Sequence, residues 1–253
     1  MTWFPQITQF PFKRTRKWRV ISNQLESGEL IQIADPDGGQ IEWNLSYRDL
    51  NDDEAASLSN LFASVQGSFG SFGYIDPLAN LFGWSEDLSK ADWQTGLLQV
   101  SSGAVDPLGT NRASVVANGS AGSQQIIQSL GVPGNYTACF SAWIRSDQPQ
   151  QVTLARDAVT YNATVDATWR RFFVSGAGVN GVDNASFAVG IDAGQSVQLW
   201  GLQAEIQAWP SQYKVTGNAG GIYEETYFAS DQLIIISTGT GLSACQVALV
   251  SRV

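Results

Sequence analysis

The side chains of this sequence that could perform acid–base chemistry are carboxylates, because the chain contains no histidine. Ser-His-Asp and Cys-His catalytic systems and His-containing zinc sites are therefore excluded. A glycosidase would need two carboxylates roughly 5 to 9 Å apart across a cleft, and the sequence does not say which acids meet in space. The candidate acids are Glu86, Asp87, Asp157, Asp166, Asp183, Asp192 and Glu205.

Most of these acids lie in turn contexts, such as Asp183-Asn184 and Asp192-Ala193-Gly194, where a side-chain oxygen stabilises the backbone. We therefore expect no enzymatic activity and no catalytic residue. Calcium binding near Glu86 or Glu205 stays open, since calcium takes several oxygen ligands, but the sequence contains no loop of regularly spaced acids. We expect no metal and no other cofactor.

Aromatic side chains with polar neighbours suit saccharides, because the faces of sugar rings stack on exposed aromatic rings. In the expected strand 136–145, Trp143 shares a face with Ser141 and Arg145, and the opposite face is apolar. Trp143 is therefore the best candidate for an exposed stacking residue. The predicted glycan-binding set is Trp143, Arg145, Arg156, Asp157, Tyr161 and Asn162.

Composition narrows the class of protein. The chain has 253 residues with 14 Lys+Arg against 23 Asp+Glu, and the net charge of -9 argues against specific nucleic-acid binding. No apolar stretch reaches the roughly 18 residues of a membrane span, and the N-terminus does not resemble a signal peptide. We expect synthesis in the cytoplasm, no membrane insertion, and buried free thiols at Cys139 and Cys245. The 25 glycines and low charge favour a mostly β fold.

A basic cluster marks the first segment of the chain. Residues 14–19 alternate in a way that suits an extended strand. One interpretation is a solvated edge strand, since Lys and Arg at an edge discourage unwanted pairing. The other is a basic strip that docks on acids of a neighbouring subunit. The predicted interface residues are Lys13, Arg14, Arg16, Lys17 and Arg19, with Asp52, Asp53 and Glu54 as the acids.

Two further patterns follow. A strand at residues 29–34, a Pro- and Gly-containing turn at 35–39 and an alternating strand at 40–47 predict a hairpin. Asn51 or Asp52 then caps a helix at about 52–66. Its apolar stripe is Ala55, Leu58, Leu61, Phe62 and Val65.

The middle of the chain predicts short strands separated by turns, as in a β-sandwich or jelly roll. The expected strands are 124–130, 136–145, 151–156, 170–175, 186–191 and 196–204. Three more strands, at 222–228, 232–237 and 244–250, cannot form a stable domain alone. We therefore predict a discontinuous small β-barrel with one helix, residues 1–78 and 215–253, and a jelly-roll domain, residues 79–214, inserted into it.

The order of features in the first segment resembles a known family. The sequences 43–47 and 72–77, Trp-Asn-Leu-Ser-Tyr and Phe-Gly-Tyr-Ile-Asp-Pro, flank a helix that begins at Glu54. This order is similar to the N-terminal part of distal-tail-type and minor tail proteins of long-tailed bacteriophages and their prophage or gene-transfer relatives. The resemblance implies a barrel that forms a homo-oligomeric ring, hexameric in that family, at the end of the tail tube, with tail tube and baseplate hub proteins as partners.

The inserted segment resembles the jelly-roll, carbohydrate-binding-module-like domains of phage head and tail proteins. The residues that carry the resemblance are the opening 80–93, the strand 136–143, Thr168-Trp169-Arg170-Arg171 and the closing strand 199–205. The resemblance assigns Trp169 and Trp200 to the core.

These features predict a non-enzymatic virion protein of the tail tip whose jelly roll holds host-surface polysaccharide. A purely structural jelly roll stays open. The alternative is a carbohydrate-binding adhesion protein that is anchored to a particle and does not form a ring.

Overall fold

The structure is a computed structural model that describes residues 1–252 and divides the chain into two compact units. Unit 1 comprises Met1–Ile75 and Tyr223–Val253, and unit 2 comprises Asp76–Ile222. The boundaries predicted from the sequence lie at 78/79 and 214/215. Strands dominate both units and α1 is the one helix of the described residues, which confirms a mostly β fold with one helix.

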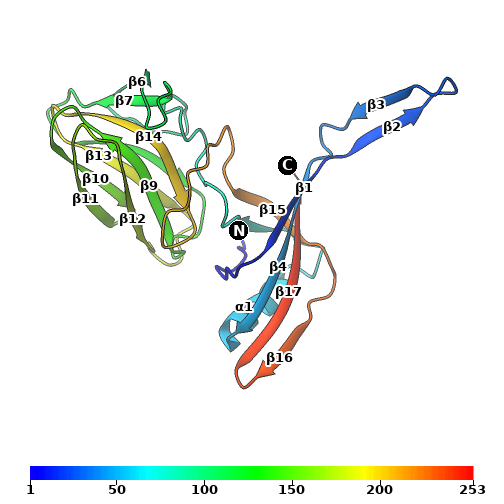
Figure 1. Cartoon of the computed structure of the whole chain (residues 1–253). Helices are drawn as coiled ribbons and strands as arrows, with labels where there is room; N and C mark the ends of the chain where they lie inside the picture. The colour runs from blue at the N-terminus through cyan, green and yellow to red at the C-terminus, as the bar shows by residue number, and fades with distance from the viewer. Residues whose placement is uncertain (253) are drawn as a thin grey trace. The chain divides into compact units, whose positions relative to one another are not determined.

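Unit 1 is built on an antiparallel sheet that joins the two ends of the chain (Figure 1). The long strands β4 and β17 pair along nearly their whole length, with Leu45 opposite Val247. The ladder ends at β1 and β5, so the expected small barrel takes the form of a sheet with two edges. Its strands in order are β1 (Lys13–Lys17), β4 (Gln40–Leu50), β17 (Leu242–Arg252), β15 (Ile222–Phe228) and β5 (Phe72–Ile75), with β16 (Ile235–Gly239) also on β17.

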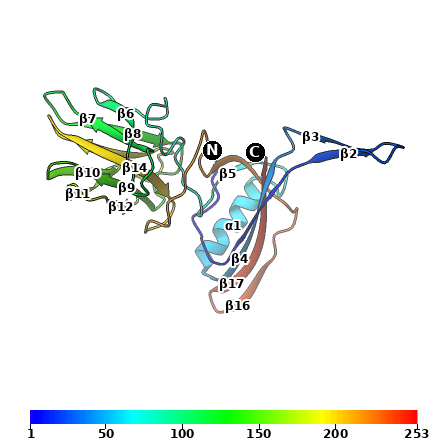
Figure 2. The same cartoon turned by 45° about the horizontal axis from the view of Figure 1, so that its top comes forward.

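Helix α1 (Asp52–Ser64) supplies the core of unit 1. It lies along the sheet formed by β4 and β17 (Figure 2), and Ala55, Leu58 and Leu61 face the same buried cluster as Trp43. The first turn is closed by a capping box, in which the Asn51 side chain accepts from the Glu54 N–H and the Glu54 carboxylate accepts from the Asn51 N–H. The helix is thus predicted correctly, with Asn51 as its cap.

Replacing Asn51 with alanine is expected to lower the free energy of unfolding of unit 1 by about 1 kcal/mol, because an amide donor of the first turn loses its acceptor. Urea unfolding followed by circular dichroism measures this loss. Ser57→Ala is the matched control, since that exposed hydroxyl only donates back to the Asp53 carbonyl. Equal losses in the two variants would contradict the capping role.

The strands β2 (Val20–Gln24) and β3 (Leu30–Ala34) form a separate two-stranded sheet, which we call the arm. The predicted hairpin between residues 29–34 and 40–47 is wrong, because β3 pairs with β2 and β4 pairs with β1. The turn at 35–39 is present, with Gly38 N donating to Asp35 O, but it breaks one long hairpin into two parts. In both views the arm runs on beyond β1 and β4 (Figures 1 and 2).

Unit 2 is a β-sandwich of two antiparallel sheets. Between them lie the alternate residues predicted to face inward, such as Phe140, Ala142 and Ile144, which are fully buried. The first sheet contains, in order, β11 (Val159–Val165), β10 (Gln150–Arg156), β13 (Ala185–Ile191) and β8 (Gln124–Leu130). The second contains β12 (Arg170–Gly176), β9 (Ala138–Arg145), β14 (Ser196–Glu205), β7 (Ala113–Ala117) and β6 (Gln99–Ala104).

The chain enters and leaves unit 2 at adjacent points. The Asp76 N–H donates to the Gly221 carbonyl at 2.9 Å, and the Gly221 N–H donates to the Asn80 carbonyl at 2.9 Å. Gly221 is required here, since a Cβ atom would collide with Ala79. On the unit 1 side, β5 ends at Ile75 and is the neighbour of β15 in the sheet.

Candidate functional site

The outer face of the five-stranded sheet of unit 2 carries a pocket of about 630 Å³, which we call the aromatic pocket. Its wall combines large aromatic rings with guanidinium and amide groups, and none of its lining residues is an acid among the residues that the structure describes. The lining residues are Pro107, Leu108, Arg112, Trp143, Trp169, Arg171, Trp200, Gln212, Tyr213 and Val215.

Three adjacent strands position the floor of the aromatic pocket. In the ladder, Trp143 of β9 lies opposite Trp200 of β14 on one side and Arg171 of β12 on the other. Residues opposite one another in antiparallel strands point to the same face, so the three side chains lie in one row. The ring centroids of Trp143 and Trp200 are 6.3 Å apart, and the Tyr213 ring lies 4.8 Å from Trp200.

A β-bulge in β14 shapes this floor. The register shifts between Trp200 and Gln203, and Gly201 takes a φ of 64°. A Cβ atom on Gly201 would lie 3.2 Å from Trp143 Cδ1 and 3.5 Å from the Tyr213 ring. Glycine therefore allows both the left-handed backbone and the close approach of the two aromatic side chains.

The two arginines of the aromatic pocket are held by defined partners. Arg112 lies over the Trp200 ring at 5.8 Å and its Nη1 contacts Glu86 Oε2 at 3.2 Å. Arg171 donates from Nη2 to the Ser141 hydroxyl at 2.9 Å and from Nη1 to the Ser211 carbonyl. Burial lowers the pKa of Arg171, and the charge of Glu205 opposes that shift. Both guanidinium groups therefore have partners that orient them.

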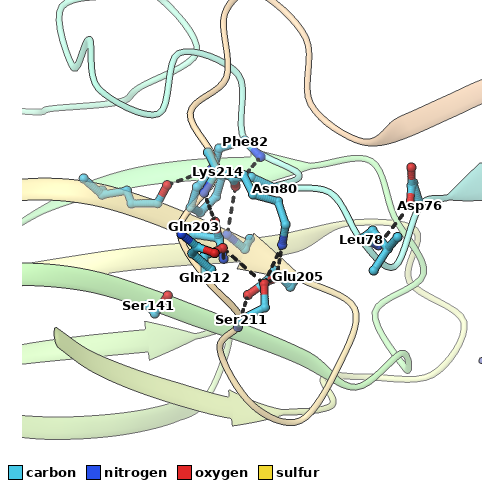
Figure 3. A network of polar contacts seen from close by, with 12 residues as sticks. Asp76, Leu78, Asn80, Phe82, Ser141, Gln203, Glu205, Ser211, Gln212 and Lys214 are labelled. Carbon is cyan, nitrogen blue, oxygen red and sulfur yellow. Dashed lines mark hydrogen bonds and ion pairs between the residues drawn. The ribbon is translucent and has the colours of Figure 1, made fainter. Parts of the chain in front are cut away.

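A buried carboxylate holds the segment that closes one side of the pocket. Glu205 is fully buried at the end of β14 and accepts from the Ser211 hydroxyl and, at 2.9 Å, from the Ser211 N–H. Lys214 Nζ lies 3.0 Å from the same carboxylate. Figure 3 shows these contacts together with Gln203, whose amide oxygen accepts from the Lys214 N–H. The segment 206–216 is therefore anchored on the outer face of the sheet, and it carries Tyr213 to the pocket.

Burial would raise the pKa of Glu205, but hydrogen bonds from Ser211 and Gln203 and the charge of Lys214 lower it below its usual value. The carboxylate is consequently ionised at neutral pH. Burial raises the pKa of the Tyr213 phenol far above its usual value, so this hydroxyl stays protonated beside Ser85, 2.9 Å away. Burial also raises the pKa of the Cys139 thiol to about 12, with a further contribution from Glu205. Cys139 and Cys245 are buried free thiols, as predicted.

No family model and no curated protein matches this chain. Among solved structures, the CBM22-1 xylan-binding domain from Paenibacillus barcinonensis Xyn10C matches at a TM-score of 0.41 and 17% identity, covering 55% of this chain and 99% of that domain. The enzymatically active domain of bacteriophage CBA120 tailspike protein 4 matches at a TM-score of 0.42 and 12% identity, covering 53% of this chain and 22% of that one. A family 11 carbohydrate-binding module from Clostridium thermocellum matches at 0.38 and 12%, covering 53% of this chain and 98% of the module.

The predicted glycan-binding residues do not form one site. Trp143 lines the aromatic pocket, and Arg145 lies beside it on β9 with its guanidinium 5.8 Å from the Trp169 ring. The other predicted residues lie on β10, on β11 or in the turn between them, in the opposite sheet. The grouping therefore needs correction, because face alternation along a strand does not tell which sheet the strand joins.

Arg156 and Asp157 pair with each other and have a structural role. Arg156 is completely buried, pairs with Asp157, and donates to the carbonyls of Gly134 and Tyr136. Burial lowers the pKa of this guanidinium. Asp157 also accepts from the Ser186 N–H. These groups tie the turn after β10 to neighbouring segments, so Arg156 does not reach a surface ligand.

Tyr161 and Asn162 are both exposed on β11. As neighbours in a strand they point to opposite faces, so they do not act as one pair. The Asn162 side chain accepts from the Thr153 hydroxyl across the ladder.

Six aromatic or polar lining residues of the pocket are absent from the predicted set: Arg112, Trp169, Arg171, Trp200, Gln212 and Tyr213. Trp200 is buried, as the resemblance implied, yet its ring forms part of the pocket wall; Trp169 is half-buried. The signal that could have found Arg171 is its spacing of two residues from Trp169, which immediately precedes β12.

The predicted interface residues of unit 1 lie on its surface. The five basic residues are all exposed, with Lys17 paired to Glu42 at 2.5 Å and Arg19 paired to Asp35. At the start of α1, Asp52 and Asp53 are exposed. Glu54 is engaged in the capping box.

Within residues 1–252, no three or more His, Cys, Asp or Glu side chains are arranged to hold a metal ion. No helix in that range has both the length and the apolar character needed to cross a membrane.

Proposed function

We propose that this protein binds a saccharide in the aromatic pocket of unit 2. The observation that carries the proposal is the convergence of three indole rings and one phenol ring on a single pocket of about 630 Å³. Ligand pockets commonly enclose about 300 to 1,000 Å³. The faces of pyranose rings stack on such aromatic surfaces, while Arg112, Arg171 and Gln212 supply hydrogen-bonding groups for the hydroxyls.

The same lining supports binding without hydrolysis. A glycosidase needs two carboxylates that flank the scissile bond, whereas none of the lining residues among residues 1–252 is an acid. We therefore expect a non-enzymatic protein. A reducing-sugar assay on each polysaccharide that binds tests this expectation, and turnover by the purified chain would contradict it.

The direct test of saccharide binding uses a panel of soluble polysaccharides and host-envelope glycans with the full chain. Three tryptophans line the pocket, so an occupied pocket is expected to change the intrinsic fluorescence, and titration calorimetry then gives the affinity. If no member of the panel bound, this part of the proposal would be overturned.

For unit 1 we propose an assembly role, as a ring-forming component at the distal end of a bacteriophage or related particle tail. The exposed edge strand β1 and the projecting arm are observations that favour this second function, since both offer surface to another subunit. On this proposal the partners are further copies, the tail tube and baseplate hub proteins, and the protein is located at the virion tail tip. Light scattering with negative-stain imaging distinguishes a closed ring from a monomeric adhesion protein.

Reversing the charge of Arg14 and Arg16 to glutamate is expected to abolish assembly while leaving the fold intact. Both side chains are exposed on the edge strand β1, and complementary charges set the register between subunits. The matched control is Lys90→Glu with Arg170→Glu, which makes the same change of net charge in unit 2. Assembly unchanged by the β1 reversal would exclude this strip from the interface.

A further inference from the structure

The arm has an apolar face that is exposed in the single chain. Its register places Ile21 opposite Ile33, Asn23 opposite Ile31, and Leu25 beside Glu29. By strand alternation these side chains share one face. We define the apolar arm face as Ile21, Leu25, Ile31 and Ile33.

The apolar arm face is open to solvent. Ile21, Ile31 and Ile33 are 49%, 42% and 55% exposed, and Leu25 is also exposed. The opposite face also carries the exposed Val20 and Leu30, but Ser22 and Gln32 lie opposite each other at its centre and Gln24 follows them. Such alternation is typical of a strand pair with one face covered, and two-stranded sheets are only marginally stable alone. The pattern therefore indicates that a partner covers this face.

Unit 1 also contains a groove that is partly lined by apolar side chains. The groove has a volume of about 630 Å³ and lies along β4, β17 and the segment that leads into β16. We call it the unit 1 groove. Its apolar side chains include Ile234 and Ile236, which are both exposed, and the smaller Ala244 and Ala248.

The charges of the arm and the unit 1 groove are complementary. The tip of the arm carries the exposed acids Glu26 and Glu29, and Glu29 lies on the same face as Ile31. The groove carries Arg48, an exposed side chain that forms no ion pair with any carboxylate of residues 1–252. An acidic tip and a basic groove raise the cost of a wrong register and favour one docking direction.

The arm does not reach the groove of its own chain. Along β4 the arm joins the sheet at the Gln40 end, where Lys17 pairs with Gln40, whereas the groove begins at Asn44. From that junction the arm runs away from the body of unit 1 in both views (Figures 1 and 2). A unit 1 groove that the arm can reach therefore belongs to another copy of the chain.

We propose that the arm of one copy docks through its apolar face in the unit 1 groove of the next copy, with Glu29 directed to Arg48. This rests on the assembly role proposed above and names the contact that produces it. Because arm and groove are different patches of one chain, the contact is heterologous and propagates from copy to copy, closing as a ring when the rotation permits.

The first experiment measures the mass of the full chain by light scattering over a range of concentrations. Wild type is expected to associate, and Ile21→Gln with Ile33→Gln to remain monomeric with an unchanged circular dichroism spectrum. Val20→Gln with Leu30→Gln is the matched control, because both residues are exposed on the opposite face of the arm, and it is expected to associate like wild type.

The second experiment tests the trans contact by charge exchange. Glu29→Arg alone and Arg48→Glu alone are each expected to weaken association at least tenfold. An equal mixture of the two variants is expected to restore association, because each arm then meets a groove of opposite charge on the other variant. A contact within one chain would not be restored by mixing.

The outcomes separate the two proposals. If wild type associates but the arm-face variant associates equally well, or mixing fails to restore association, the arm–groove contact is overturned while ring assembly stands. A wild-type chain that stays monomeric up to its solubility limit overturns both.

Discussion

Replacing Trp143 with alanine is expected to lower saccharide affinity by about 30-fold or more. The Trp143 side chain lies between those of Trp200 and Arg171 on the floor of the aromatic pocket, so its loss removes the central stacking surface. Central aromatic contacts in binding sites commonly contribute about 2 kcal/mol or more, which corresponds to that change in affinity. Titration calorimetry with the tightest-binding polysaccharide measures it.

The control for Trp143 is Trp18→Ala, which removes an exposed indole from unit 1 and is expected to leave the affinity unchanged. Trp143→Phe is expected to retain part of the affinity, because a smaller ring still stacks. Thermal unfolding of each variant checks that unit 2 remains folded. Equal affinity of wild type and Trp143→Ala would rule out the aromatic pocket as the saccharide site.

Replacing Glu205 with glutamine is expected to lower the free energy of unfolding of unit 2 by about 2 kcal/mol. Removing one partner of a buried ion pair commonly costs about 3 to 5 kcal/mol. The expected loss is smaller because the Lys214 side chain is 35% exposed and remains partly solvated. Urea unfolding measures the difference, and Arg170→Gln, which breaks an exposed ion pair with Asp166, is expected to change little.

Glu205 also predicts a dependence on pH. Its pKa is lowered in the folded chain, so its contribution to stability is present above the ordinary glutamate pKa of about 4.3 and is lost as the pH falls through the lowered value. Wild type is therefore expected to lose more stability than Glu205→Gln between about pH 7 and about pH 3. Parallel pH profiles of the two proteins would contradict an ionised, stabilising Glu205.

Because Glu205 anchors the segment that carries Tyr213, the same substitution is expected to weaken saccharide binding as well. Trp143→Ala should change affinity with little change in stability. Glu205→Gln should change both.

Local patterns predicted much of the fold. Gln124–Leu130 and Ile222–Phe228 form strands with the predicted bounds, because alternation and bounding turn residues define them. The capping box at Asn51 and Glu54 and the inward face of β9 follow from equally local rules. Strands β2, β5, β6, β7 and β11 were missed. In β11, exposed threonine and asparagine alternate with buried alanine and valine toward its end, which weakens its apolar signal.

Pairing and sheet membership were less predictable, because they depend on residues far apart in sequence. The residues of Leu30–Ala34 do not by themselves determine that this strand pairs with the preceding strand β2 rather than with the following strand β4. Arg156 was placed in the predicted glycan-binding set for the same reason. Its hydrogen-bond partners, the carbonyls of Gly134 and Tyr136, are about twenty residues away in sequence. The aromatic pocket also depends on the bulge at Gly201, whose backbone conformation is not evident from a single glycine between two strand residues.

The adjacent entry and exit of unit 2 have an evolutionary consequence. The Asp76 and Gly221 backbones are hydrogen-bonded to each other, and on the unit 1 side β5 and β15 are neighbouring strands of one sheet. Without the insert, those two strands would need only a short turn to connect them. Recombination could therefore delete unit 2, or exchange it for any domain whose ends lie close together, without disturbing the sheet. A lineage built on unit 1 would thus be able to change the domain it carries in a single genetic event.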